Sequence, residues 1–166
     1  MKKATIDIDN RQTRYRISRK AIRKIIQSAL DALDNPDGEL SLVLVDDIQM
    51  TVINRDYLNR DRPTNVIAFP MREGPFGDIT PGLLGDVVVS IETAAAEAQS
   101  AGLALTTRFC QLLIHGILHL LGYNHEESDK DAVIMDAKSR EVLKLIMEKS
   151  ESAPHFPEIL IDSEAI

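Results

Sequence analysis

Hydrophobic and polar positions are arranged along the chain in blocks that predict alternating strands and helices. Residues 4–9 (ATIDID) alternate between apolar and polar side chains, which is typical of a half-buried strand. Ser18 is suited to cap a helix whose apolar side chains share one face, namely Ile22, Ile25, Ile26, Ala29, Leu30 and Leu33. Residues 35–38 (NPDG) then predict a turn, and residues 40–45 (LSLVLV) predict a second strand.

The segment after the second strand predicts a helix from Asp46 or Asp47 to about Leu58. Its inward face is expected to carry Ile48, Val52 and Ile53. The elements predicted after it are a loop at 60–64, a strand at 65–70, a surface loop at 71–84, a strand at 85–91, and helices at 92–102, at 106 or 107 to 121, and at about 128–148. Gly122 is the expected stop of the middle one of these three helices.

The order of the elements predicts an α/β (or α+β) fold with a single mixed four-stranded sheet, layered with about five to six helices. The length of 166 residues indicates one domain, which we assign to residues 1–150. Residues 151–166 are expected to form an acidic and mostly loose C-terminal tail, although FPEILI (156–161) is apolar enough to dock on the domain.

Composition is typical of an ordinary soluble globular protein, with 44% hydrophobic and 27% charged residues. No segment approaches the roughly 20 apolar residues of a membrane span, and the first ten residues lack the apolar core of a secretion signal. Cys110 is the single cysteine, so no intrachain disulfide can form, which fits a reducing, cytoplasmic location. Its apolar neighbours favour a buried structural thiol over a nucleophile.

Charge is distributed unevenly along the chain. The net charge is −7, but residues 1–24 contain nine Lys and Arg residues against Asp7 and Asp9, which is +7 and leaves −14 for the remainder. A basic end on an acidic body is one signature of nucleic-acid binding. The alternative is a strand and a helix face whose charges are simply solvated.

Three of the four histidines lie in HGILHLLGYNH, at positions 115, 119 and 125. His115 and His119 are one helical turn apart, so their side chains leave the same face. Gly122 permits a left-handed turn that returns His125 toward the same point. Three neutral imidazoles form a tripod for a divalent metal, preferably zinc, with the fourth position open to water as in catalytic sites. The alternative is a set of hydrogen-bonded core histidines, and His155 in the tail is expected to take no part.

The same spacing occurs in metallopeptidases, which carry a glutamate directly after the first histidine as the general base. Gly116 occupies that position here and has no side chain. A peptidase function would therefore need a carboxylate from elsewhere in the chain.

Three segments resemble the YbeY family of bacterial ribosomal-RNA maturation factors: HGILHLLGYNH (115–125), LNRDRPTNVIAFP (58–70) and GDVVVSIETAAAEA (85–98). The resemblance implies a compact α/β fold and one Zn²⁺ on His115, His119 and His125. It also implies a single-strand-specific, metal-dependent endoribonuclease for the 3′ end of small-subunit ribosomal RNA and for ribosome quality control. The implied partners are single-stranded or ribosomal RNA and the ribosome or its proteins; no membrane or DNA partner is expected.

Three positions depart from the family pattern. Leu58 stands where the family usually has arginine, so Arg60 or Arg62 is expected to supply the catalytic positive charge; the alternative is that both are solvated loop arginines. Asn124 stands where aspartate is common, which removes a carboxylate that could orient a ligand. Ala68 stands where the family tends to have serine.

The expected mechanism begins with zinc, which lowers the pKa of its water toward about 7. An arginine then neutralises the charge that develops on the phosphate. Basic residues of the first strand and helix, with Arg60, Arg62 and Arg72, are expected to follow the RNA backbone. Asp86 is either a turn residue or an acid facing the site. The second hypothesis is a non-catalytic, zinc-stabilised ribosome-assembly factor, for which a closed coordination shell would be diagnostic.

Overall fold

The computed structural model describes residues 2–71, 82–123, 128–151 and 160–162. Its main sheet has four strands in the order β1-β3-β5-β4, with bounds Thr5–Asn10 (β1), Glu39–Val45 (β3), Leu83–Ser90 (β5) and Val66–Pro70 (β4). β3 pairs in parallel with both β1 and β5, and β4 pairs antiparallel with β5. The predicted mixed four-stranded sheet is therefore confirmed.

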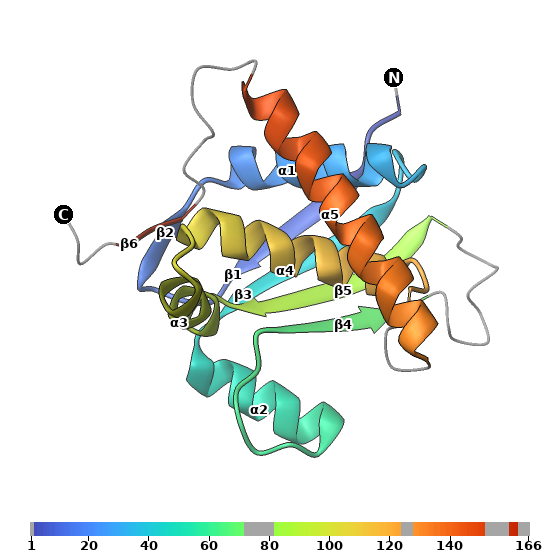
Figure 1. Ribbon diagram of the computed structural model, residues 1–166. Coiled ribbons are helices and arrows are strands. Elements are labelled where there is room, and N and C mark those ends of the chain that lie inside the picture. The colour runs from blue at the N-terminus through green and yellow to red at the C-terminus, as the bar shows by residue number, and fades with distance from the viewer. Residues whose placement is uncertain (1, 72–81, 124–127, 152–159, 163–166) are drawn as a thin grey trace.

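Five helices accompany this sheet in the described part of the chain: α1 (Arg19–Ala32), α2 (Asp47–Leu58), α3 (Ile91–Ala101), α4 (Leu105–Leu120) and α5 (Asp129–Glu151). α1, α4 and α5 lie over one face of the sheet, and α2 lies on the other side (Figure 1). The predicted α/β fold class is confirmed, with helix bounds within three residues of those expected. Taken singly, none of these helices is long and apolar enough to span a membrane; α3 and α4 reach that standard only as a pair, and the chain bends by 118° between them.

The two faces of the sheet have different cores because side chains alternate along each strand. One face presents Ile8, Leu42 and Val87 to the large core under α1, α4 and α5. The opposite face presents Val45, Ile67 and Val88 to a smaller core that includes Met50 of α2. Asp86 follows the same alternation, so it lies on the α2 side; it is within a strand, so the interpretation as a turn residue is wrong.

α1 matches its predicted amphipathic pattern. The Ser18 hydroxyl accepts a hydrogen bond from the Ala21 N–H at 3.2 Å and caps the helix. All six apolar side chains predicted for its inner face are buried: Ile22, Ile25, Ile26, Ala29, Leu30 and Leu33.

The predicted inward face of α2 is wrong at two of three positions. Ile48 is 79% exposed and Val52 is 41% exposed, although Ile53 does pack against the smaller core. The side chains that are buried instead are Met50 and Asn54. The apolar residues of α2 itself lie on several sides of the helix, so its sequence periodicity does not select one buried face. The Asp46 capping box fixes only where the helix begins.

A second, two-stranded sheet was not expected. β2 (Tyr15–Ile17) pairs antiparallel with β6 (Leu160–Asp162). The tail was expected to be mostly loose, and β6 shows that part of FPEILI docks as the alternative allowed. Of the surface loop expected at 71–84, residues 72–81 lie outside the described part, and Leu83 and Leu84 belong to β5.

Candidate metal centre

α4 is the central helix of the molecule, and its packing explains the glycine after His115. A Cβ atom at Gly116 would lie 2.6 Å from Cγ1 of Val87 and 3.3 Å from Cγ2 of Val66. Real Cβ atoms essentially never lie within 3.0 Å of another heavy atom, so the contact with Val87 requires glycine at position 116 while α4 sits this near to β5. Packing therefore requires glycine at the position where a metallopeptidase has its glutamate.

His115 and His119 meet on one side of α4. Their Nε2 atoms are 3.1 Å apart, and their ring centroids are 4.7 Å apart with an interplanar angle of 75°. Two nitrogens bound to one tetrahedral zinc ion lie about 3.3 Å apart, because each Zn–N distance is about 2.0–2.1 Å. The separation of the two Nε2 atoms is therefore close to the one that a shared ion requires, and it is equally the distance of a hydrogen bond between the two rings, which is the alternative stated above.

The turn after α4 also has the predicted form. Gly122 has φ +97°, in the region that favours glycine. The Tyr123 N–H donates to the Leu118 carbonyl and the Gly122 N–H donates to the His119 carbonyl, each at 3.0 Å. These two bonds form a Schellman motif, which ends the helix at Leu120, directly after His119.

His125 and Asn124 lie outside the described residues, so the third predicted ligand stays a prediction. Within the described part, no group of three His, Cys, Asp or Glu side chains is placed to hold an ion. The donor set that the structure does place, two imidazole nitrogens in contact, fits Zn²⁺.

A polar pocket of about 480 Å³ opens beside His115, between α4, α5 and the start of β4. Arg108 and Gln111 precede His115 by seven and four residues, so all three lie along one stripe of α4. The full lining is Asn65, Val66, Arg108, Gln111, Leu112, His115, Asp136, Ser139, Arg140 and Leu143. Ion-pairing and amide groups therefore flank the predicted metal ligands.

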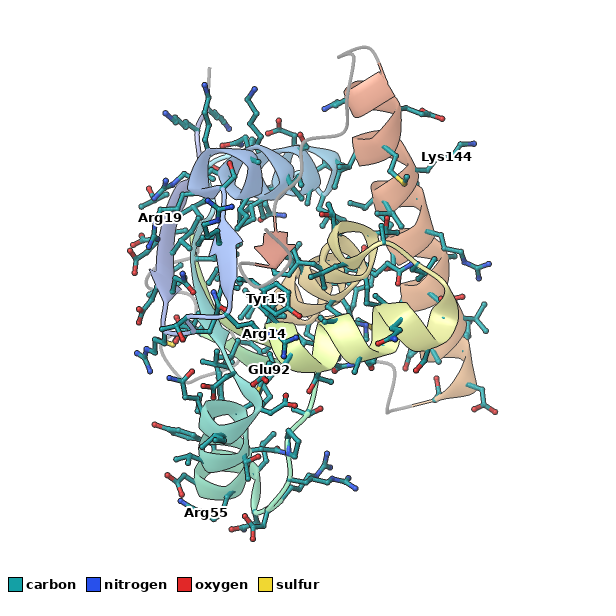
Figure 2. The ribbon with its side chains drawn as sticks, turned by 90° about the vertical axis from the view of Figure 1, so that its left-hand side faces the viewer. Arg14, Tyr15, Arg19, Arg55, Glu92 and Lys144 are labelled. Carbon is teal, nitrogen blue, oxygen red and sulfur yellow. The ribbon has the colours of Figure 1, made fainter. Side chains whose placement is uncertain are left out.

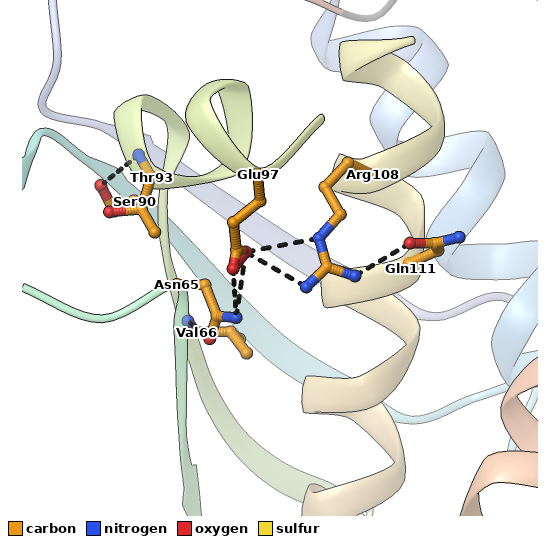
Figure 3. A network of polar contacts seen from close by, with 7 residues as sticks. All are labelled: Asn65, Val66, Ser90, Thr93, Glu97, Arg108 and Gln111. Carbon is orange, nitrogen blue, oxygen red and sulfur yellow. Dashed lines mark hydrogen bonds and ion pairs between the residues drawn. The ribbon is translucent and has the colours of Figure 1, made fainter. Parts of the chain in front are cut away.

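A hydrogen-bonded network, Asn65–Glu97–Arg108, fixes one wall of this pocket (Figure 3). The Asn65 amide donates to both carboxylate oxygens of Glu97, at 3.1 and 3.2 Å. Arg108 donates to the same carboxylate from Nε at 3.3 Å and from Nη2 at 3.1 Å, and its Nη1 donates to Gln111 at 2.9 Å. The network joins the start of β4 to α3 and α4.

Our sequence interpretation missed this network, since its members come from three separate elements. The one available signal was the spacing of Arg108, Gln111 and His115 along α4, which places them on the same helix face.

Arg60 and Arg62, the predicted catalytic arginines, lie in the exposed loop after α2. Buried Asn54 holds the backbone of this loop: its backbone carbonyl accepts from the Arg60 N–H at 3.2 Å, and its side-chain amide donates to the Arg62 carbonyl at 2.8 Å. Neither arginine lines the pocket beside His115. Their catalytic role stays a prediction.

The remaining singled-out residues have clear places. Leu58 ends α2 and is 44% exposed, and Ala68 lies on the α4 side of β4, packed against the large core. Asp86 lies on the opposite face of the sheet from α4, so it does not face the histidines. Cys110 is fully buried, which confirms the structural interpretation, and burial raises the pKa of its thiol to about 12.

Comparison with known proteins gives a consistent result. The family model for Endoribonuclease YbeY matches residues 7–147. A protein of Geobacter sulfurreducens named Endoribonuclease YbeY is 50% identical over 142 residues, covering 85% of this chain and 95% of that protein. One of the same name from Syntrophotalea carbinolica is 48% identical over 145 residues, covering 87% and 97%.

A solution structure of a Thermotoga maritima protein superposes with a TM-score of 0.64 at 22% identity. The match covers 90% of this chain and 94% of that chain, and it supports the fold.

Proposed function

The chain belongs to the Endoribonuclease YbeY family, and from that premise we propose that it is a zinc-dependent, single-strand-specific endoribonuclease. The observation that carries the zinc dependence is the 3.1 Å contact between Nε2 of His115 and Nε2 of His119 on α4. Since the family model and the relatives share the name of an RNA-cleaving enzyme, hydrolysis of a phosphodiester bond is the reaction to assign to this centre.

Neutral His115 and His119, together with His125, would hold the ion. When bound, the ion would supply a Lewis acid and would lower the pKa of water at this site toward about 7. Arg108 and its partners keep the pocket wall rigid, so that RNA meets a fixed arrangement of donors. In this proposal Arg60 or Arg62 neutralises charge that develops on the cleaved phosphate.

The proposed substrate is ribosomal RNA, with the 3′ end of the small-subunit RNA as the processed region and with ribosome quality control as a second role. The proposed setting is the cytoplasm, in contact with the ribosome or its proteins. These finer assignments come from the resemblance of the three sequence segments to the family.

The decisive experiment measures metal content and RNA cleavage on the same preparations. We expect about one zinc per chain in the unmodified protein and far less in His119→Ala, because loss of one imidazole from a three-ligand site removes a third of the donors. Cleavage of a single-stranded RNA should fall in parallel, by about 100-fold or more.

The matched control is His155→Ala, which removes a histidine that is not a predicted ligand. It should keep both zinc and activity. Equal cleavage by His119→Ala and the unmodified protein would overturn the proposal, and full zinc occupancy without any cleavage would favour the non-catalytic assembly role.

A further inference from the structure

A basic groove runs between the N-terminal segment and the outer face of α1. Its volume is about 670 Å³, and its lining includes five cations, Lys2, Lys3, Lys20, Arg23 and Lys24, against the single carboxylate of Asp31. All five cations are exposed, and no salt bridge among the described residues involves them. This concentration of positive charge stands out on a chain with a net charge of −7.

Gln27 builds this basic groove. Its Oε1 accepts from the Ala4 N–H at 2.8 Å, and its amide donates to Asp31 at 2.9 Å and to the Pro36 carbonyl at 2.8 Å. These bonds fasten the segment before β1 alongside α1, so two lysines from one element face three cations from another. Lys20 and Lys24 lie one turn apart, about 6 Å along the helix, and form a row of charges.

The chemistry of the basic groove fits a polyanion with regularly spaced charges. Four of its five cations are lysines, a residue depleted at protein–protein interfaces and suited to point contacts with phosphate. The acidic side chains of β1, Asp7 and Asp9, alternate onto the other face of the sheet and do not oppose these charges.

The basic groove is remote from the metal centre. It borders β1, which is one edge of the sheet, whereas the pocket beside His115 borders β4, which is the opposite edge. Three strand spacings of about 4.8 Å separate these edges by roughly 14 Å. An RNA that occupies both places must extend well beyond the cleaved bond.

We propose that this basic groove is a second RNA-binding site, which holds the sugar–phosphate backbone of a long substrate at a distance from the bond that is cut. The proposal rests on the proposed function, since it assumes that the chain cleaves RNA. Its consequence is that long RNAs bind more tightly than short ones, with an unchanged catalytic step.

The test compares cleavage of single-stranded RNAs of about 8 and about 40 nucleotides by the unmodified protein and by Lys20→Gln/Lys24→Gln. KM for the long RNA should rise about tenfold at 0.15 M salt, and the slope of log(kcat/KM) against log[salt] should become shallower by about 1.4, which corresponds to two phosphate contacts. The values of kcat on both RNAs and KM on the short RNA should stay unchanged.

The matched control is Arg55→Gln/Lys144→Gln, which removes the same charge from exposed positions on α2 and α5. Both side chains point away from α1 and its basic groove (Figure 2). This variant should keep the KM of the unmodified protein for both RNAs.

Several results would overturn the second site. One is a rise of KM in the control variant equal to that in Lys20→Gln/Lys24→Gln. The others are that KM of Lys20→Gln/Lys24→Gln rises equally on the short RNA, or that it does not change on the long RNA. If Lys20→Gln/Lys24→Gln loses binding to vesicles of phosphatidylglycerol and phosphatidylcholine but cleaves the long RNA normally, the basic groove binds a membrane surface. That result would also overturn the second RNA-binding site. Failure of the unmodified protein to cleave either RNA would instead contradict the proposed function itself.

Discussion

Gly116 sets how closely α4 approaches the sheet, and its replacement is the sharpest stability test on this helix. We expect Gly116→Ala to lower the free energy of unfolding by about 1–3 kcal/mol, since the added methyl overlaps buried Val87. The gain in helix propensity from glycine to alanine, about 1 kcal/mol, offsets only part of this. Denaturant unfolding measures the change.

Gly82 supplies the control for that substitution, because a Cβ atom there meets nothing within 4 Å. Gly82→Ala should change the free energy of unfolding by less than about 0.5 kcal/mol. If Gly116→Ala proves as stable as the unmodified protein, the close approach of α4 to β5 is not what requires glycine.

Cys110 predicts a specific dependence of stability on pH. Burial raises the pKa of its thiol from 9.0 to about 12, so the folded protein keeps this proton over a range in which the unfolded chain releases it. Its contribution to stability is therefore complete below about pH 9 and is lost as pH rises above that value. Cys110→Ala lacks this thiol, so it escapes this loss. The difference in the free energy of unfolding between the unmodified protein and Cys110→Ala should therefore shrink by about 1 kcal/mol between about pH 8 and pH 10.

Urea unfolding at both pH values measures this difference. The cavity cost of Cys110→Ala does not depend on pH, so the change in the gap between the two proteins isolates the thiol. Parallel pH profiles would show that the thiol ionises equally in the folded and unfolded chains.

Among the elements, the Asn65–Glu97–Arg108 network joins β4, α3 and α4, and its coupling can be measured. Arg108 and Glu97 are partly buried, with side-chain exposures of 26% and 34%. A double-mutant cycle of Asn65→Ala and Glu97→Ala should give a coupling free energy of about 1 kcal/mol in unfolding experiments. The single variants should also slow RNA cleavage, because the start of β4 loses its fixed position beside the pocket.

Asp136 and Arg140 on α5 provide the reference cycle, since they form an ion pair with side-chain exposures of 63% and 76%. Exposed pairs couple weakly, so this cycle should give less than about 0.5 kcal/mol. Equal couplings in the two cycles would mean that the partly buried network contributes no more than a surface ion pair.

α1 and α2 show why some elements follow from sequence and others do not. In α1 the buried residues repeat with a helical period and the polar residues occupy the remaining positions, so one face is determined. In α2 the buried Asn54 looks like a surface residue in the sequence. Its side chain is held inside by the Arg62 carbonyl, which lies in the loop after the helix.

For the whole molecule, the same distinction separates what was predicted of the site from what was not. His115, His119 and Gly122 belong to one helix and its turn, so local geometry brings the two imidazoles together. The position of Arg60 and Arg62 relative to those histidines depends on how the loop after α2 crosses the molecule. No local pattern encodes that path, and only the folded chain shows that both side chains are exposed there.

The pairing of β2 with β6 has a consequence for how the molecule assembles. Residues 18–159 separate the two strands, so this small sheet would carry the entropic cost of closing a very large loop if it formed before the rest of the chain had folded. During translation, β2 is synthesised long before β6. The pairing of β2 with β6 therefore forms after the layers that carry the histidines have come together.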